Sequence, residues 1–161
     1  MSAPTVIKST DQGAPILNCS AGGAIALLRY IAAQLQIPIV YYTNNVIVLK
    51  PASYKNNNTL HYRFDDSVSS GCIDTRLVKV SAYESMSDMN TGIGHVGTVF
   101  MSKGKSVNTS ARSYKVIGDQ YGFYIFTVAI HNNSGTSPNN LFYFGATNPL
   151  FDGDLNFSLL S

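Results

Sequence analysis

The side chains that could perform acid–base or metal chemistry are few and scattered. The histidines His61, His95 and His131 stand in unrelated contexts, and none has a His or Cys partner at metal-ligand spacing. Two acidic pairs, Asp65-Asp66 and Asp152-Gly-Asp154, could hold a hard cation, but calcium loops use more than two carboxylates. Aspartate and glycine favour tight turns, so turn formation explains both pairs better than a metal site or a glycosidase-like carboxylate pair. We therefore expect no metal and no cofactor.

Nucleophilic and phosphate-binding motifs are absent as well. The glycine-rich stretch at residues 91–97 lacks the Gly-Lys-Ser/Thr ending of a P-loop, and no strand leads through it into a helix. There is no Gly-x-Ser-x-Gly motif, and neither Cys72 nor the serines have an identifiable base partner. Cys19 and Cys72 are too few for a zinc site; two buried thiols are favoured, and a disulfide between them stays open. The sequence predicts a protein that is not an enzyme.

Aromatic residues form three clusters with a possible binding role. They are Tyr41-Tyr42, Tyr121 with Phe123-Tyr124, and residues 142–144 (Phe-Tyr-Phe). Neighbouring residues of a strand point to opposite faces, so each cluster places one ring inward and another outward. Inward rings belong to the core, whereas outward rings could stack on sugars or enter a protein interface, where Tyr and Phe are enriched. The sequence leaves both roles open.

Composition excludes several classes of protein. The 161 residues suit one domain, and 45% hydrophobic residues are enough to form a core, which excludes disorder. Only 12% of residues are charged, and the eleven Lys and Arg residues form no patch, so we expect no nucleic-acid partner. There is no apolar run long enough to span a membrane, and residues 1–8 do not resemble a signal peptide. We expect the chain to fold in a cytoplasm without a membrane partner.

The elements that must position these residues are one helix and many strands. A helix is expected at about residues 20–36, because Ala24, Leu28, Ile31 and Leu35 recur at helical spacing and Pro38 ends it. Asn18 or Ser20 is the expected cap. The helix is apolar nearly all round and must be covered on more than one face, either by a sheet and loops or by other subunits.

Strands are expected before and after the helix. Residues 1–17, with Pro4 and Pro15, should form an extended apolar arm that pairs with its own sheet or with a neighbour's. Asn44-Asn45 should form a two-residue hairpin turn. Residues 83–97 are expected to be irregular. The remaining strands are expected at residues 39–43, 46–50, 60–65, 76–82, 98–101, 113–118, 123–130, 141–144 and 155–160.

The predicted fold is mainly β (α+β), because the βαβ alternation of a parallel sheet is missing. Residues 18–161 should form one antiparallel β-sandwich or partly closed barrel with the N-terminal helix packed on it. With few charges to protect sheet edges, subunits packed edge to edge are expected. The predicted subunit-interface residues lie on the arm and the helix: Val6, Ile7, Ile16, Leu17, Leu27, Leu28, Ile31 and Leu35.

Six segments, in this order, resemble a family of small virion-associated structural proteins of tailed bacteriophages. They are residues 10–15 (TDQGAP), 23–28 (GAIALL), 83–92 (YESMSDMNTG), 111–119 (ARSYKVIGD), 123–126 (FYIF) and 142–145 (FYFG). The likeness covers most of the chain, although tryptophan is absent and residues 37–59 diverge. The resemblance implies a location in the virion and brings no catalytic residues with it.

Three functions are compatible with these observations. The first is a non-enzymatic structural component of a tailed-bacteriophage virion, in head decoration or in the tail or baseplate. It would assemble with copies of itself and with other virion proteins through the N-terminal arm and sheet edges. The second is a carbohydrate-binding module or a receptor-binding adhesin tip that binds glycans through exposed Tyr and Phe rings. The third is a small hydrolase that acts through the Asp pairs. The arm, the apolar helix and the family resemblance favour the first.

Overall fold

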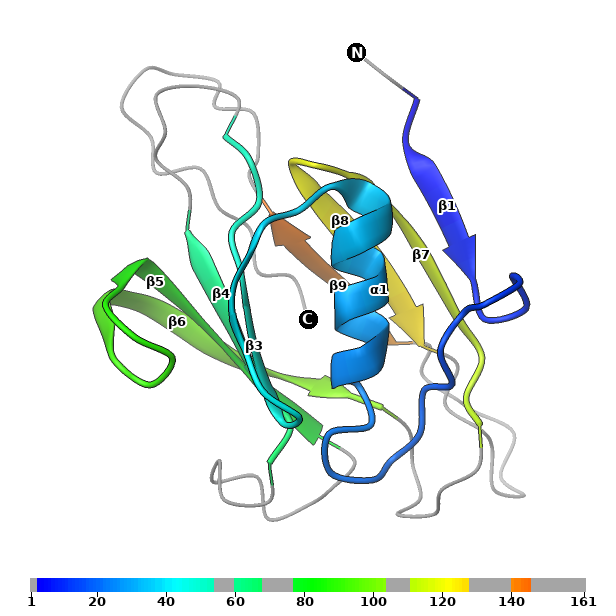
Figure 1. Cartoon of the computed structure of the whole chain (residues 1–161), viewed down its shortest axis with the longest axis horizontal. Coiled ribbons are helices and arrows are strands. Elements are labelled where there is room, and N and C mark those ends of the chain that lie inside the picture. Colours follow the sequence, from blue (N-terminus) through cyan, green and yellow to red (C-terminus); the bar gives the residue numbers. More distant parts are fainter. Residues whose placement is uncertain (1–2, 54–59, 68–76, 104–110, 128–139, 146–161) are drawn as a thin grey trace.

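Two antiparallel sheets and one helix make up the fold in the computed structural model (Figure 1). The structure describes residues 3–53, 60–67, 77–103, 111–127 and 140–145. The five-stranded sheet has the order β2-β3-β4-β5-β6 and the four-stranded sheet the order β1-β7-β8-β9. The sheets are not closed into a barrel, and the mainly β sandwich with one packed helix is confirmed. The elements are β1 (Thr5–Lys8), α1 (Ile25–Leu35), β2 (Ile39–Tyr42), β3 (Val46–Leu49), β4 (His61–Asp65), β5 (Leu77–Met86), β6 (Gly92–Ser102), β7 (Tyr114–Asp119), β8 (Gly122–Thr127) and β9 (Asn140–Gly145).

The helix lies between the two sheets and closes one side of the sandwich. Figure 1 shows α1 between β3 and β7, and it contacts β3 of one sheet and β1 and β7 of the other. Its apolar residues therefore find cover within the chain. The helix begins at Ile25, five residues later than expected, after a turn in which Gly22 has a φ of +73°. It ends at Leu35, and Gln36 follows in the left-handed conformation.

The cap of this helix differs from the predicted one. Asn18 does not bond the helix; its side-chain oxygen accepts a hydrogen bond from the Ser20 backbone N–H at 3.0 Å. Ala24 is the N-cap and has no side-chain oxygen to offer. Instead, its backbone N–H donates to a carboxylate oxygen of Asp66 at 2.8 Å. The helix is therefore capped by Asp66, the residue after β4, which lies far from Ala24 in the sequence.

The extended arm pairs with its own sheet. β1 lies antiparallel to β7, with Val6 opposite Ile117 and Ile7 opposite Val116. Ile7 points into the core, whereas Val6 on the other face is 46% exposed. The structure thus selects the first of the two pairings expected for the arm.

The glycine-rich region forms a long hairpin, so the expectation of an irregular segment at residues 83–97 is wrong. β5 and β6 are paired from Leu77 opposite Ser102 to Met86 opposite Gly92, with one register shift between Ala82 and Tyr83. The alternation of apolar and polar residues that is typical of a strand is obscured in this part of the sequence, because β6 is an edge strand whose apolar residues do not all face the core. Asn44-Asn45 does turn the β2–β3 hairpin as expected, since the Thr43 N–H donates to the Val46 carbonyl at 2.7 Å.

A cluster of aromatic rings joins the two sheets. The Phe144 ring on β9 lies 4.9 Å from the Phe64 ring on β4 and 5.5 Å from the Phe123 ring on β8. The Tyr62 hydroxyl, also from β4, donates to the Gly145 carbonyl at 2.9 Å. These contacts hold β9 against the five-stranded sheet.

Candidate functional site

The two adjacent aspartates have separate structural roles. Asp66 is buried, and its second carboxylate oxygen accepts a hydrogen bond from the Lys103 ammonium at 2.5 Å, with both side chains inaccessible to solvent. The Lys103 ammonium also donates to the Ser20 carbonyl at 2.5 Å. Burial raises the pKa of the Asp66 carboxyl, while Lys103 and the Ala24 N–H oppose that shift. The pair thus connects β4, β6 and the start of α1 and leaves no oxygen directed at a ligand.

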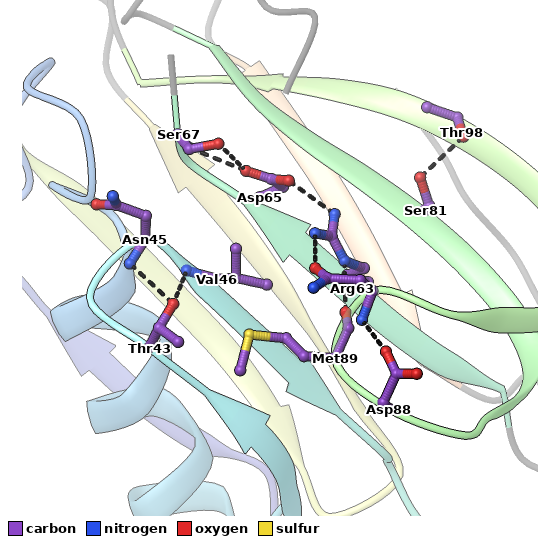
Figure 2. A network of polar contacts seen from close by, with 11 residues as sticks. Thr43, Asn45, Val46, Arg63, Asp65, Ser67, Ser81, Asp88, Met89 and Thr98 are labelled. Carbon is purple, nitrogen blue, oxygen red and sulfur yellow. Dashed lines mark hydrogen bonds and ion pairs between the residues drawn. The ribbon is translucent and has the colours of Figure 1, made fainter. Parts of the chain in front are cut away.

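Asp65 belongs to a second network, on the side of the five-stranded sheet that points away from the core (Figure 2). Its carboxylate accepts hydrogen bonds from the Arg63 guanidinium at 2.8 Å and from the Ser67 hydroxyl at 2.6 Å. Arg63 also donates to the Met89 carbonyl at 2.8 Å and to the Asn90 side chain at 3.2 Å. The hydrogen bonds from Ser67 and Arg63 lower the pKa of Asp65 despite its burial. This network fastens the tip of the β5–β6 hairpin over β4.

The two histidines that the structure describes lie in separate surroundings. His61 is buried on β4, and burial together with the nearby Lys50 charge lowers the pKa of its imidazole. His95 lies on β6, where its ring packs against Tyr83 and its Nε2 is 2.9 Å from the Thr98 hydroxyl. Within the described ranges, no group of three or more His, Cys, Asp or Glu residues could hold a metal ion.

Several candidates named from the sequence lie outside the described residues. They are His131, Cys72, the Asp152-Gly-Asp154 pair and the strand expected at residues 155–160. Cys19 is buried, with a free thiol. The part of the chain that the structure describes contains no helix of the length and apolarity that crossing a membrane requires.

The aromatic clusters divide between core and surface. Phe123, Phe142 and Phe144 are buried between the sheets. Tyr124 and Tyr143 point away from the core, with ring centroids 4.6 Å apart, and Tyr124 is 41% exposed. The clusters on β8 and β9 each supply an inward ring and an outward ring, the two roles that the sequence left open. The cluster on β2 does not, because Tyr41 is half-buried and Tyr42 is 52% exposed.

The edge strand β6 is an exposed apolar feature that the sequence analysis identified only in part, as the strand expected at residues 98–101. It occupies one end of the five-stranded sheet, and β5 is its only strand neighbour among the described elements. Ile93, Val96 and Phe100 are 57%, 37% and 47% exposed. Its eleven residues include no Lys, Arg, Asp or Glu. The uncharged run from residue 89 to residue 102 was the signal that could have identified it.

Two of the eight predicted subunit-interface residues are exposed on the surface of the chain. Val6 is 46% and Ile16 is 65% exposed, so both are available to a neighbouring molecule. The other six are at most 3% exposed, because they pack in the core of their own chain: Ile7, Leu17, Leu27, Leu28, Ile31 and Leu35. The four helix residues among them are covered by the two sheets, and Ile7 and Leu17 belong to the same core.

Comparison of the chain with protein-family models, with curated proteins and with solved structures found no match. The functional argument therefore depends on the surfaces described above. Two of them are open to a partner: the β6 edge and the outer side of the four-stranded sheet.

Proposed function

We propose that the chain is a non-enzymatic structural component of a tailed-bacteriophage virion, located in head decoration or in the tail or baseplate. It folds in the host cytoplasm and then assembles with copies of itself through the β6 edge. The family resemblance supports the virion location. The single observation that supports assembly is the open, uncharged edge of β6 with Ile93, Val96 and Phe100 exposed.

An edge strand of this kind is a template for pairing. Its outer backbone N–H and C=O groups face away from β5, and soluble monomers usually protect such an edge with Lys, Pro or a short strand. β6 has eleven residues and carries no charge that would repel an identical strand. Antiparallel pairing of β6 with β6 of a second copy satisfies both backbones and brings the exposed apolar residues of the two copies together. The contact is isologous and closes after two subunits.

The test is the mass of the purified protein in solution, measured by light scattering after size exclusion. The wild type should be a dimer or a multiple of one, and Val96→Lys and Phe100→Lys should shift it toward the monomer by introducing facing like charges. Val40→Lys is the matched control, because Val40 is also 37% exposed but lies on β2, at the opposite edge of the same sheet. A monomeric wild type, or equal dissociation by Val40→Lys, overturns the β6 assignment.

A carbohydrate-binding function is the second candidate, and the exposed ring of Tyr124 favours it. An exposed tyrosine on a sheet face can stack on a sugar, and Tyr143 beside it extends the aromatic surface. Screening the wild type and Tyr124→Ala on a glycan array separates the two functions. Glycan binding that is lost in Tyr124→Ala supports the second candidate, whereas a purely structural protein binds no glycan.

A further inference from the structure

The outward side of the four-stranded sheet carries two complete cross-strand rows of side chains. The first row is Val6, Ile117, Tyr124 and Tyr143, which are direct register partners across β1, β7, β8 and β9. The second row is Lys8, Lys115, Phe126 and Leu141, in the same strand order. We call these eight residues the outer face.

The alternation of burial fixes the direction in which the outer face points. Ile7, Val116, Ile125 and Phe142, which lie between its members along the four strands, are all buried in the core. The outer face therefore points away from the sandwich. Val6 is 46% exposed, and Tyr124 and Leu141 are each 41% exposed. A surface with six apolar or aromatic residues out of eight is typical of a protein interaction site.

Charge at one corner of the outer face specifies the partner. Lys8 and Lys115 are directly opposite each other on β1 and β7, and both are exposed. Like charges in this position repel, and no described carboxylate forms an ion pair with either ammonium. The acidic residues nearest to them in sequence accept backbone hydrogen bonds: Asp11 accepts from the Lys8 N–H, and Asp119 accepts from the Tyr121 N–H. A carboxylate placed between the two ammonium groups would relieve their repulsion.

We propose that the outer face docks an acidic, apolar polypeptide segment of another virion protein, with a carboxylate of that segment between Lys8 and Lys115 and its apolar side chains on the Tyr124 row. The charge complementarity of the lysine pair favours a polypeptide with carboxylates over a neutral glycan. This surface lies on the other sheet from β6, so the proposal does not depend on the β6 contact.

The experiment uses the full-length protein labelled with ¹⁵N and a blocked hexapeptide, Leu-Phe-Asp-Leu-Asp-Phe, as the probe. Amide shift changes should cluster on β1, β7 and β8, and binding should weaken as salt is added. Lys115→Gln should weaken binding by about fivefold, the effect of one close charge pair near water. Lys50→Gln, which removes a lysine next to β3, is the matched control and should bind as the wild type does.

Three outcomes overturn the proposal. The first is an absence of shift changes on these strands, and the second is equal binding of the peptide with both aspartates replaced by asparagine. The third is glycan binding at Tyr124 that the acidic peptide does not displace. Failure here leaves the dimer test at β6 unaffected, because Lys115→Gln and Val96→Lys alter different sheets.

Discussion

Replacing Lys103 with methionine should be among the most destabilising changes available at a charged residue. Methionine fills a volume similar to that of the lysine stem. It removes the ammonium group that pairs with the buried Asp66 carboxylate, which then keeps its hydrogen bond from the Ala24 N–H. Removing one partner of a buried pair costs about 3–5 kcal/mol, because the other charge stays buried without compensation. For a domain of this size, that corresponds to a fall in Tm of about 6–20 °C. Urea and thermal unfolding followed by circular dichroism measure both quantities.

A second substitution tests whether the uncompensated charge is the cause. Asp66→Asn added to Lys103→Met removes the charge and keeps an oxygen that can accept from the Ala24 N–H. The double variant should therefore be more stable at pH 7 than Lys103→Met alone. If instead the losses of unfolding free energy caused by Lys103→Met and by Asp66→Asn add in the double variant, Lys103 acts through packing and the electrostatic explanation is refuted.

The pH dependence of Lys103→Met gives an independent check. Burial already raises the pKa of Asp66 above the ordinary 3.8, and loss of Lys103 raises it further. A carboxyl whose pKa is higher in the folded state binds its proton more tightly there, so lowering the pH favours folding. The unfolding free energy of Lys103→Met, relative to that of the double variant, should rise as the pH falls from 7 toward 4. A difference in unfolding free energy between the two variants that does not change with pH would show that the Asp66 carboxyl is not the titrating group.

Two further predictions concern the outer side of the five-stranded sheet. Arg63→Met removes the charge-assisted hydrogen bonds to Asp65 and to the Met89 carbonyl, so it should lower the unfolding free energy by about 1–3 kcal/mol. Amide hydrogen exchange at the tip of the β5–β6 hairpin should become faster. Unchanged exchange would show that other contacts hold the tip. Burial lowers the pKa of His61 in the folded state below the ordinary 6.5, so the unfolded chain takes up this proton more readily than the folded one. The unfolding free energy therefore keeps its full value above pH 6.5 and decreases as the pH falls toward 5. His61→Gln should flatten the stability curve between pH 7 and 5, and an unaltered curve would exclude His61 as the titrating group.

The sequence predicts elements whose signals are local. The end of α1 follows from Pro38 two residues beyond Gln36, and the β2–β3 hairpin follows from Asn44-Asn45, because both depend on backbone preferences of a few residues. The division of aromatic rings between core and surface also follows from the period of a strand. These predictions needed no knowledge of distant contacts.

Features decided by distant contacts were not predictable in this way. The start of α1 is set by Asp66, which lies 42 residues beyond Ala24, and local sequence suggested Asn18 or Ser20 instead. Nothing in the spacing pairs Lys103 with Asp66. The apolar pattern of the helix likewise could not distinguish cover by its own sheets from cover by another subunit, since both require the same residues. The first half of the candidate edge β6, before the strand expected at residues 98–101, was missed because an exposed strand with three glycines has little alternation.

The positions of the two proposed surfaces constrain the assembly. β6 ends the five-stranded sheet, whereas the outer face belongs to the four-stranded sheet. An isologous contact through β6 closes after two copies and cannot by itself extend into a ring or a fibre. It leaves an outer face on each subunit, so a dimer would carry two docking sites related by its two-fold axis. Growth into a larger structure must then use a second surface. The two lysines that face each other on the outer face favour an acidic segment of another protein there, as proposed above.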